Sequence, residues 1–351
     1  MDATTVAVDL AKDVFEVAMA NQVGRILERK RLTRRQFEAF IDALPGGTRV
    51  VMEACGTAHY WGRRCQAHGH DVQLLPVQYV KPYVRRNKTD RLDTEALLEA
   101  ARCAGIHPVP VKTSEQQALQ ALHRVRTQWQ RTRTARINTL RGMLREHGMP
   151  IAQGARSVLT KMPRILEDAE NGLPAQLYLA LARVYDEVRA LERDIKDIDR
   201  QLARVAAADP VAQRLLTIPG IGVITATALL GAVAHIHAFR RARHFASWLG
   251  LTPRERSSGF RRHLGRISKR GDVYLRCLLT HGARAVLLTA QRTLRGKGHG
   301  TRVQHWAVAV AGRRGHNKAA IAVANKLARV VWAVWRGERD FSGGPQLPVA
   351  A

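Results

Sequence analysis

Four acidic residues in the first hundred positions have the chemistry of a divalent-metal site. Asp90 and Asp93 lie three residues apart in the stretch KTDRLDTEAL, so a helix there would place both on one face. Asp9 lies on the first expected strand, and Glu53 closes a later, buried one. A buried carboxylate is costly unless it is paired or bound to metal. The four acids therefore indicate a site for hard cations such as Mg²⁺ or Mn²⁺, which take carboxylates together with water and phosphate oxygens.

Helix capping is the simpler interpretation of the aspartate pair. With Asp90 as the N-cap residue, Asp93 would lie three residues later and would favour the helix dipole. This interpretation leaves Asp9 and Glu53 unexplained. Three nearby acids are interpreted as solvated or capping residues outside any site: Asp13, Asp71 and Glu95.

The chain has a large excess of positive charge. It carries 57 Lys and Arg against 29 Asp and Glu, which gives a formal net charge of +28. The cations are spread through the chain, which favours a nucleic-acid partner over acidic membrane lipid. No apolar run reaches the ~20 residues of a membrane span, and the N-terminus has no basic region of a signal peptide. We therefore expect a cytoplasmic protein that does not bind membranes.

The densest basic stretch runs from residue 239 to 276 and contains eleven Lys and Arg against two acids. Such density suits contact with the phosphate backbone of nucleic acid. Within it, the sequence Ser257-Ser258-Gly259 forms an expected loop between arginines. A serine in such a loop ordinarily has no special role. The alternative is a nucleophile toward phosphorus, because arginines lower the cost of an alkoxide and hold the phosphate.

Ten cations are predicted to contact nucleic acid. They lie beside the aspartate pair, in an arginine-rich helical segment and in the dense basic stretch. They are Arg86, Lys88, Arg126, Arg133, Arg256, Arg261, Arg262, Arg266, Lys269 and Arg270.

A short glycine motif, Pro219-Gly220-Ile221-Gly222, separates two helical patterns and is typical of a helix-hairpin-helix. In that motif the glycine turn brings backbone N–H groups close to a DNA phosphate, and the next helix adds its dipole. The alternative is a simple tight turn between two helices. The prediction is that Gly220 and Gly222 contact phosphate.

The elements that position these residues fall into three domains and a tail. Residues 1–112 predict a mixed α/β domain: a hairpin over residues 4–20, a strand near 26–31, a helix over 33–44, a strand ending at 53, a helix near 60–68, a strand over 71–77 and a helix from 90. Residues 113–208 are almost entirely helical, with a heptad-like pattern near the end that fits an antiparallel helical hairpin or coiled coil, or an ordinary bundle helix. Residues 209–341 predict a mainly helical domain, and residues 342–351 a flexible tail.

The order of the four acids resembles that in the ribonuclease-H-like fold of Holliday-junction resolvases of the RuvC type. More closely, six segments are similar to the DEDD-type transposases of the insertion-sequence 110 family, 1111 group. These segments are VAVDLAKDVFEVA, VVMEACGTAHYW, KTDRLDTEAL, IPGIGVITATALL, FASWLGLTPRERSSG and LGRISKRGDVYLRCLL.

This resemblance implies a mechanism. Asp9, Glu53, Asp90 and Asp93 would form the metal site, and Ser258, just before a glycine, would attack the DNA backbone and hold the strand as a phosphoserine. The neighbouring Ser257 leaves the choice of serine open. The resemblance also implies a guide RNA, donor and target DNA, and a dimer or tetramer formed through the helical middle, in the bacterial nucleoid.

The sequence thus predicts a transposase that exchanges DNA strands with a serine nucleophile. Two alternative functions are consistent with the same residues. In the first, the protein is a metal-dependent, structure-specific endonuclease that uses water and leaves the serine idle. In the second, it is a nucleic-acid-binding scaffold whose acids do no chemistry.

Overall fold

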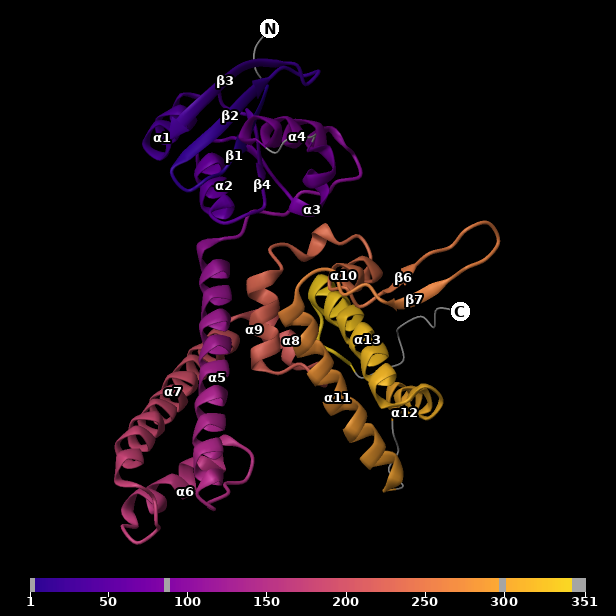
Figure 1. Ribbon diagram of the computed structural model, residues 1–351. Coiled ribbons are helices and arrows are strands. Elements are labelled where there is room, and N and C mark those ends of the chain that lie inside the picture. Colours follow the sequence, from indigo (N-terminus) through magenta and orange to yellow (C-terminus); the bar gives the residue numbers. More distant parts are fainter. Residues whose placement is uncertain (1–3, 85–88, 297–300, 343–351) are drawn as a thin grey trace. The chain divides into compact units, whose positions relative to one another are not determined.

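The computed structural model describes residues 4–84, 89–296 and 301–342 (Figure 1). The chain divides into two compact units, residues 1–117 and 118–351. Arg86 and Lys88, two of the predicted nucleic-acid contacts, lie outside the described residues, as does the expected tail beyond residue 342.

A five-stranded sheet forms the centre of the first unit, with the strand order β3-β2-β1-β4-β5. Strands β1, β2 and β3 are antiparallel neighbours, whereas β4 and β5 run parallel to β1. The strands are β1 (Thr5–Asp9), β2 (Val14–Ala20), β3 (Ile26–Thr33), β4 (Arg49–Glu53) and β5 (Asp71–Leu75). These strands confirm the predicted ones.

Helices cover both faces of this sheet because its central strands are apolar on both sides. On one face, Phe15 packs among Phe37 of α1 (Arg34–Ala43) and Trp61 of α2 (Ala58–Ala67). On the other, the small residues Ala7 and Ala18 pack against α4 (Asp90–Arg102). The short α3 (Val77–Val80) and the 3₁₀ helix η1 (Lys81–Tyr83) precede α4. The prediction of a mixed α/β arrangement is confirmed.

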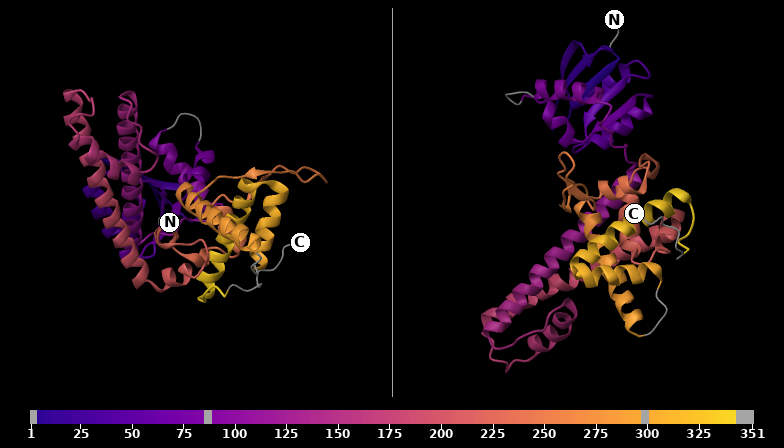
Figure 2. Two further views of the ribbon diagram at one scale, coloured as in Figure 1. Left: turned by 90° about the horizontal axis from the view of Figure 1, so that it is seen from below. Right: turned by 90° about the vertical axis from the view of Figure 1, so that its right-hand side faces the viewer.

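Three long or medium helices follow: α5 (Ser114–Glu146), α6 (Ala155–Glu167) and α7 (Ala175–Ala208). Arg126 of α5 pairs with Asp199 of α7 at 2.5 Å, and Arg133 pairs with Glu192 at 2.7 Å. The partner's number falls by seven as the arginine's rises by seven, so the two helices run antiparallel, side by side in Figures 1 and 2. The predicted antiparallel helical hairpin is confirmed.

The rest of the second unit is helical around one apolar core, with a single β-hairpin among the described residues. Its helices are α8 (Pro210–Leu216), α9 (Val223–Ala232), η2 (Ile236–Ala238), α10 (Ala242–Trp248), α11 (Val273–Arg295), α12 (Arg302–Arg314) and α13 (His316–Gly337). The hairpin strands are β6 (Pro253–Glu255) and β7 (Leu264–Ile267). Among the described helices, none is both long and apolar enough to cross a bilayer.

A buried histidine joins three of these helices. His123 of α5 contacts the Tyr274 hydroxyl of α11 through Nδ1 and the Thr227 hydroxyl of α9 through Nε2, each at 3.1 Å. Burial, followed by the charge of Arg126, lowers the pKa of His123 to about 4. The ring is therefore neutral at physiological pH, and its two nitrogens are satisfied by hydroxyl groups.

Candidate functional site

Three of the four predicted acids meet at one end of the sheet. Asp9 ends β1, and Asp90 and Asp93 lie in the first turn of α4. One carboxylate oxygen from each lies within 4.8 Å of the others. The packing of α4 across Ala7 of β1 brings its first turn to the end of that strand. The donor set consists of hard oxygen ligands on two rigid elements, which fits a divalent cation.

The cap of α4 is Thr89 and not Asp90. The Thr89 hydroxyl accepts a hydrogen bond from the Leu92 N–H at 3.4 Å, and Asp90 is the first helical residue. The interpretation of Asp90 as the N-cap is therefore wrong. Because threonine satisfies the free N–H group, neither aspartate is needed for that role.

Glu53 lies beside this cluster at the end of β4. Val8 pairs with Met52 in the parallel register of β1 and β4, so Asp9 and Glu53 each follow the last paired residue of two adjacent strands. Glu53 is not one of the three acids whose oxygens lie within 4.8 Å of one another. Burial, then the charges of Glu53 and Asp9, raises the pKa of the nearby Cys55 thiol. The negative charges of both carboxylates thus raise the pKa of one and the same thiol.

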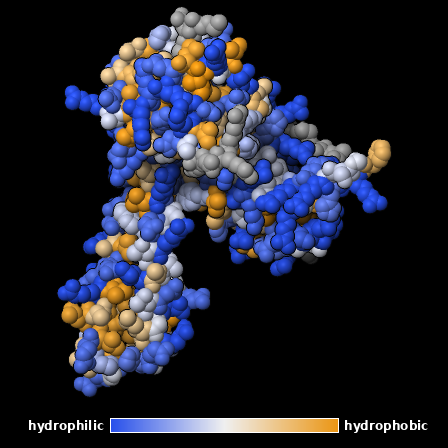
Figure 3. Space-filling model, turned by 45° about the horizontal axis from the view of Figure 1, so that its top comes forward, coloured by the Kyte–Doolittle hydropathy of each residue, from blue (hydrophilic) through white to orange (hydrophobic). Residues whose placement is uncertain are grey.

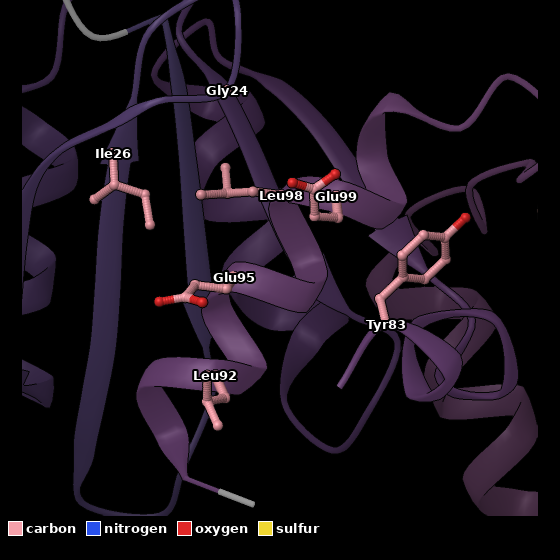
Figure 4. Close-up of a pocket in the computed structure, with 7 residues that line it drawn as sticks. All are labelled: Gly24, Ile26, Tyr83, Leu92, Glu95, Leu98 and Glu99. Carbon is pink, nitrogen blue, oxygen red and sulfur yellow. The ribbon is translucent and has the colours of Figure 1, made fainter. Parts of the chain in front are cut away.

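The three acids predicted to lie outside the site have separate surroundings. Asp71 pairs with Arg49 at 3.1 Å, Glu95 pairs with Arg29 at 2.5 Å, and Asp13 is exposed. Glu95 also lines a cavity of about 230 Å³ that contains none of the clustered acids (Figure 4). The cavity residues come from the β2–β3 turn, β3, η1 and α4: Gly24, Ile26, Tyr83, Leu92, Glu95, Leu98 and Glu99.

The two candidate serines lie at the end of the β6–β7 hairpin, which projects from the helices of its unit (Figures 1 and 2). Ser258 and Arg261 exchange two backbone hydrogen bonds, at 3.2 and 3.1 Å, and Arg256 N–H donates to the His263 carbonyl at 3.0 Å. These bonds continue the register of Glu255 opposite Leu264. The expected serine loop is therefore the ordered end of a hairpin. Its strands were not predicted, because arginine-rich segments lack the alternation of a half-buried strand.

The register separates the two serines. Side chains alternate along a strand, and opposite residues share a face. Ser258 therefore lies with Arg256, Arg261 and His263 on one face of the hairpin, whereas Ser257 lies on the other.

The face of Ser257 carries a carboxylate. The Ser257 hydroxyl donates to Glu255 Oε1 at 2.8 Å, and Arg262 Nε donates to the same oxygen at 3.1 Å. The hydrogen bond from Ser257, followed by that from Arg262, lowers the pKa of Glu255. Among the described residues, the Ser258 hydroxyl makes no side-chain hydrogen bond. Ser258 is exposed, as are Arg256 and Arg261 on the same face.

Two glycines fix the base of this hairpin. Gly250 has a φ of 71°, and a Cβ there would lie 2.0 Å from the Arg270 carbonyl oxygen. Gly271 has a φ of 83°, and a Cβ there would lie 1.9 Å from the Trp248 carbonyl oxygen. Only glycine permits this close approach of two backbones in the left-handed region. Lys269 and Arg270, two predicted phosphate contacts, belong to this base, and Arg266 lies on β7; all three are exposed.

The two glycines of the Pro219–Gly222 motif have different surroundings. Gly220, with a φ of 89°, lies against Gly282 of α11, where a Cβ would come within 2.8 Å of the Gly282 carbonyl oxygen. Gly222 is exposed, has open space around its Cβ position and precedes α9 without a side-chain cap. Gly220 is thus required for packing, and Gly222 is the one open to a phosphate.

Comparison with known proteins identifies the family of the chain. A family model described as a transposase, of the DEDD type from IS110 elements, matches residues 6–149, and one described as the transposase IS116/IS110/IS902 family matches residues 212–297. A "Probable family 20 transposase" of Pseudomonas aeruginosa is 40% identical over 98% of this chain and 100% of its own length. The transposase for insertion sequence element IS1111A of Coxiella burnetii is 39% identical over 98% of this chain and 92% of its own length.

The chain belongs to the IS110 family of DEDD transposases. It is therefore an enzyme that cleaves and rejoins DNA, and DNA is its partner. The resemblance that the sequence motifs indicated is confirmed. For a DEDD transposase a divalent metal is also implied, and the cluster of Asp9, Asp90 and Asp93 is where the described residues offer its ligands.

Two arginines predicted to contact nucleic acid have another role in this transposase. Arg126 and Arg133 form the ion pairs between α5 and α7, and their side chains are 14% and 23% exposed. Their guanidinium groups already have carboxylate partners. Arg262 of the hairpin also has a carboxylate partner, Glu255. The predicted cations of the described residues that are exposed and form no ion pair there are Arg256, Arg261, Arg266, Lys269 and Arg270.

Other candidate contacts were missed from the sequence. Helices α11, α12 and α13 of the transposase carry eleven Lys and Arg and no Asp or Glu. Lys326 lies 4.6 Å from the ring centre of Trp306, and burial followed by the charges of Arg329 and Arg302 lowers the pKa of Lys326. Such crowding would be relieved by an anion. The signal was visible in the sequence: no acid occurs between Asp272 and Glu338.

Proposed function

We propose that this chain is a metal-dependent transposase in which Ser258 attacks the DNA backbone. The observation that carries the proposal is the separation of the two serines by the hairpin register. Ser258 shares its face with Arg256 and Arg261, whereas Ser257 is bonded to Glu255. Arginines around a hydroxyl hold the phosphate and stabilise the charge that develops as the hydroxyl attacks.

The bond changes follow from this geometry. Ser258 Oγ forms a bond to phosphorus, and the bond from phosphorus to one deoxyribose oxygen breaks. The proton lost by the serine balances the proton gained by the released sugar hydroxyl. The DNA strand is then held as a phosphoserine, and attack by another sugar hydroxyl reverses the step and rejoins DNA.

The N-terminal domain, residues 1–112, is proposed to be ribonuclease-H-like. Three antiparallel strands followed by two parallel ones, with helices on both faces, support this assignment. Asp9, Asp90 and Asp93, with Glu53 beside them, would hold Mg²⁺ or Mn²⁺. A divalent cation there supplies positive charge against a phosphate oxygen. The role of the chain is to fix the carboxylates on β1, β4 and α4.

The remaining proposals concern assembly. Residues 113–208 would form the oligomerisation domain of a dimer or tetramer, and residues 209–341 the transposase domain, followed by a tail over 342–351. The oligomerisation proposal is supported by apolar side chains that gather at the end of the helical hairpin (Figure 3), where Met143 and Leu179 are exposed. A guide RNA would occupy part of the basic surface. The net charge of +28 is large enough for the chain to bind RNA and DNA together.

The direct test is a denaturing gel of the protein with DNA that contains the element's ends. We expect a covalent protein–DNA adduct with the wild-type chain and none with Ser258→Ala. Cleavage at the wild-type level by Ser258→Ala would instead establish the water-using endonuclease. Chelation of divalent metal should abolish the adduct.

The acids need a test of their own. Asp90→Ala should abolish strand cleavage while leaving DNA affinity close to that of the wild type. Recombination that survives this substitution, with DNA binding unchanged, would exclude the metal-site proposal. Glu95→Ala, on the same helix but paired with Arg29, is the matched control and should keep its activity.

A further inference from the structure

The tip of the β6–β7 hairpin carries an unusual hydrophobic side chain. Phe260 is 110% exposed, the highest value among the large hydrophobic side chains of the described residues. It lies two residues after Ser258. A phenylalanine in this position contributes nothing to the core of its own unit, and exposed aromatic rings of this kind are typical of binding surfaces.

The position of the ring is set by the backbone. The two hydrogen bonds between Ser258 and Arg261 close a turn whose central residues are Gly259 and Phe260. Gly259 has a φ of 53°, which favours glycine, and a Cβ there would meet nothing within 4 Å. The turn therefore holds the ring at the outermost point of the hairpin.

The charges around the ring indicate what it binds. Arg256 and Arg261 are exposed on the face of Ser258, and Arg262 is exposed on the other. The one carboxylate of the tip, Glu255, already bonds to Arg262 and Ser257. An aromatic ring among arginines suits a nucleic-acid strand, in which phosphates meet the cations and a base meets the ring. A purely apolar protein partner would leave these cations desolvated and unpaired.

We infer that Phe260 inserts against a DNA base next to the phosphate that Ser258 attacks, and stacks on it. This inference deepens the proposed function and rests on it for the identity of that phosphate. An unstacked base beside the attacked phosphate opens the backbone to the serine, since apolar wedges partly unstack the base steps they enter. Phe260 is a positioning residue: it fixes the strand, and Ser258 does the chemistry.

The test compares probes that differ in bases but not in phosphates. Full-length protein is titrated with oligothymidylate of about 20 nucleotides, with an abasic strand of the same length, and with oligouridylate. Phe260→Ala should weaken binding of oligothymidylate about 5- to 150-fold and leave the abasic strand unchanged. Phe260→Tyr should restore binding. Leu264→Ala, which removes another exposed apolar side chain of the hairpin, is the matched control.

Each other outcome contradicts the inference. An equal loss on the abasic strand would mean that the ring acts on the backbone or on hairpin structure. A loss confined to oligouridylate would assign the ring to RNA. Unchanged affinity of Phe260→Ala for all probes would mean that the ring stacks on no base. A change of oligomeric state in light scattering would mean that the ring contacts a second copy of the chain.

The same experiment separates this inference from the serine proposal. Ser258→Ala removes the nucleophile but leaves the ring, so it should bind oligothymidylate as the wild type does. If the adduct is absent in wild-type protein while Phe260→Ala still loses base-dependent binding, the serine proposal fails and base stacking stands. If the adduct forms at the wild-type rate with Phe260→Ala, stacking is not used in the reaction.

Discussion

Ser257 donates its hydroxyl hydrogen to Glu255 at 2.8 Å, and this bond distinguishes it from its neighbour Ser258. The backbone N–H of His263 donates to the same serine oxygen at 3.2 Å. The Ser257 side chain thus links the two strands of the hairpin through hydrogen bonds. It lies beside a carboxylate that would repel phosphate. This bonding supports the proposal that Ser258, and not Ser257, is the nucleophile.

Replacement of Ser257 tests this division of roles. Ser257→Ala should keep the covalent adduct, with a rate reduced no more than about tenfold, since a lost exposed hydrogen bond costs about 1 kcal/mol. The measurement is the rate of adduct formation on a denaturing gel, beside Ser258→Ala. An adduct that disappears with Ser257→Ala and persists with Ser258→Ala would reverse the assignment.

Gly220 and Gly222 should respond differently to alanine. Gly220→Ala forces a Cβ against Gly282 in a left-handed backbone and should lower the free energy of unfolding by about 2–4 kcal/mol. Gly222→Ala has open space, so unfolding should change little, whereas DNA affinity should fall. Urea unfolding and DNA titration of both variants give the comparison. Equal stability of the two variants would contradict the packing role of Gly220.

The ion pair of Arg133 and Glu192 should serve the helical hairpin rather than nucleic acid. Arg133→Ala leaves a carboxylate that is 16% exposed without its partner, and should cost about 1–3 kcal/mol of stability. The exchange of both residues, Arg133→Glu with Glu192→Arg, should recover part of this loss. DNA affinity is measured in parallel. A single variant with unchanged stability and weaker DNA binding would return Arg133 to the nucleic-acid surface.

His123 predicts a pH dependence of stability. Its pKa is about 4 in the folded chain, against 6.5 for an unperturbed histidine, which represents the unfolded chain. Between these two pH values the unfolded chain therefore binds one proton more than the folded chain. Stability is therefore complete above pH 6.5 and falls as the pH drops toward 4, by about 3 kcal/mol from this group.

The check is urea unfolding of wild type and His123→Gln across this range. The variant is less stable at pH 7, but its curve should fall less steeply toward pH 4. His59, whose pKa burial also lowers to about 4, contributes the same trend in both proteins and does not affect the difference. Parallel curves would show that His123 does not carry the dependence.

Much of the first unit could be predicted from the sequence because its patterns are local. Alternation around Val6 and Val8 predicted β1, and Thr33 with Gln36 forms the capping box that starts α1. Helical spacing placed Asp90 and Asp93 on one face, and the metal-site chemistry together with the family resemblance predicted that they meet Asp9, as they do. The role of Thr89 was missed, because a threonine before an aspartate leaves two candidate caps and only the backbone decides between them.

The second unit was less predictable because pairing between distant residues decides it. The ion partners of Arg126 and Arg133 lie some sixty to seventy residues away, so an arginine-rich helix was interpreted as a nucleic-acid surface. The β6–β7 register, which divides Ser257 from Ser258, depends on cross-strand hydrogen bonds that no residue pattern announces. The contact of Gly220 with Gly282 is equally invisible in the sequence.

The β6–β7 hairpin is attached to its unit at the base, where Gly250 and Gly271 lie against backbone, and its tip is exposed throughout. Apart from Gly259, whose left-handed backbone favours glycine, substitutions at the tip should therefore carry a small folding penalty, whereas those of Gly250 and Gly271 should carry a large one. Most side chains of the tip can therefore be exchanged in a variant library without loss of the fold. Differences among such variants would report recombination itself, uncoupled from expression and folding.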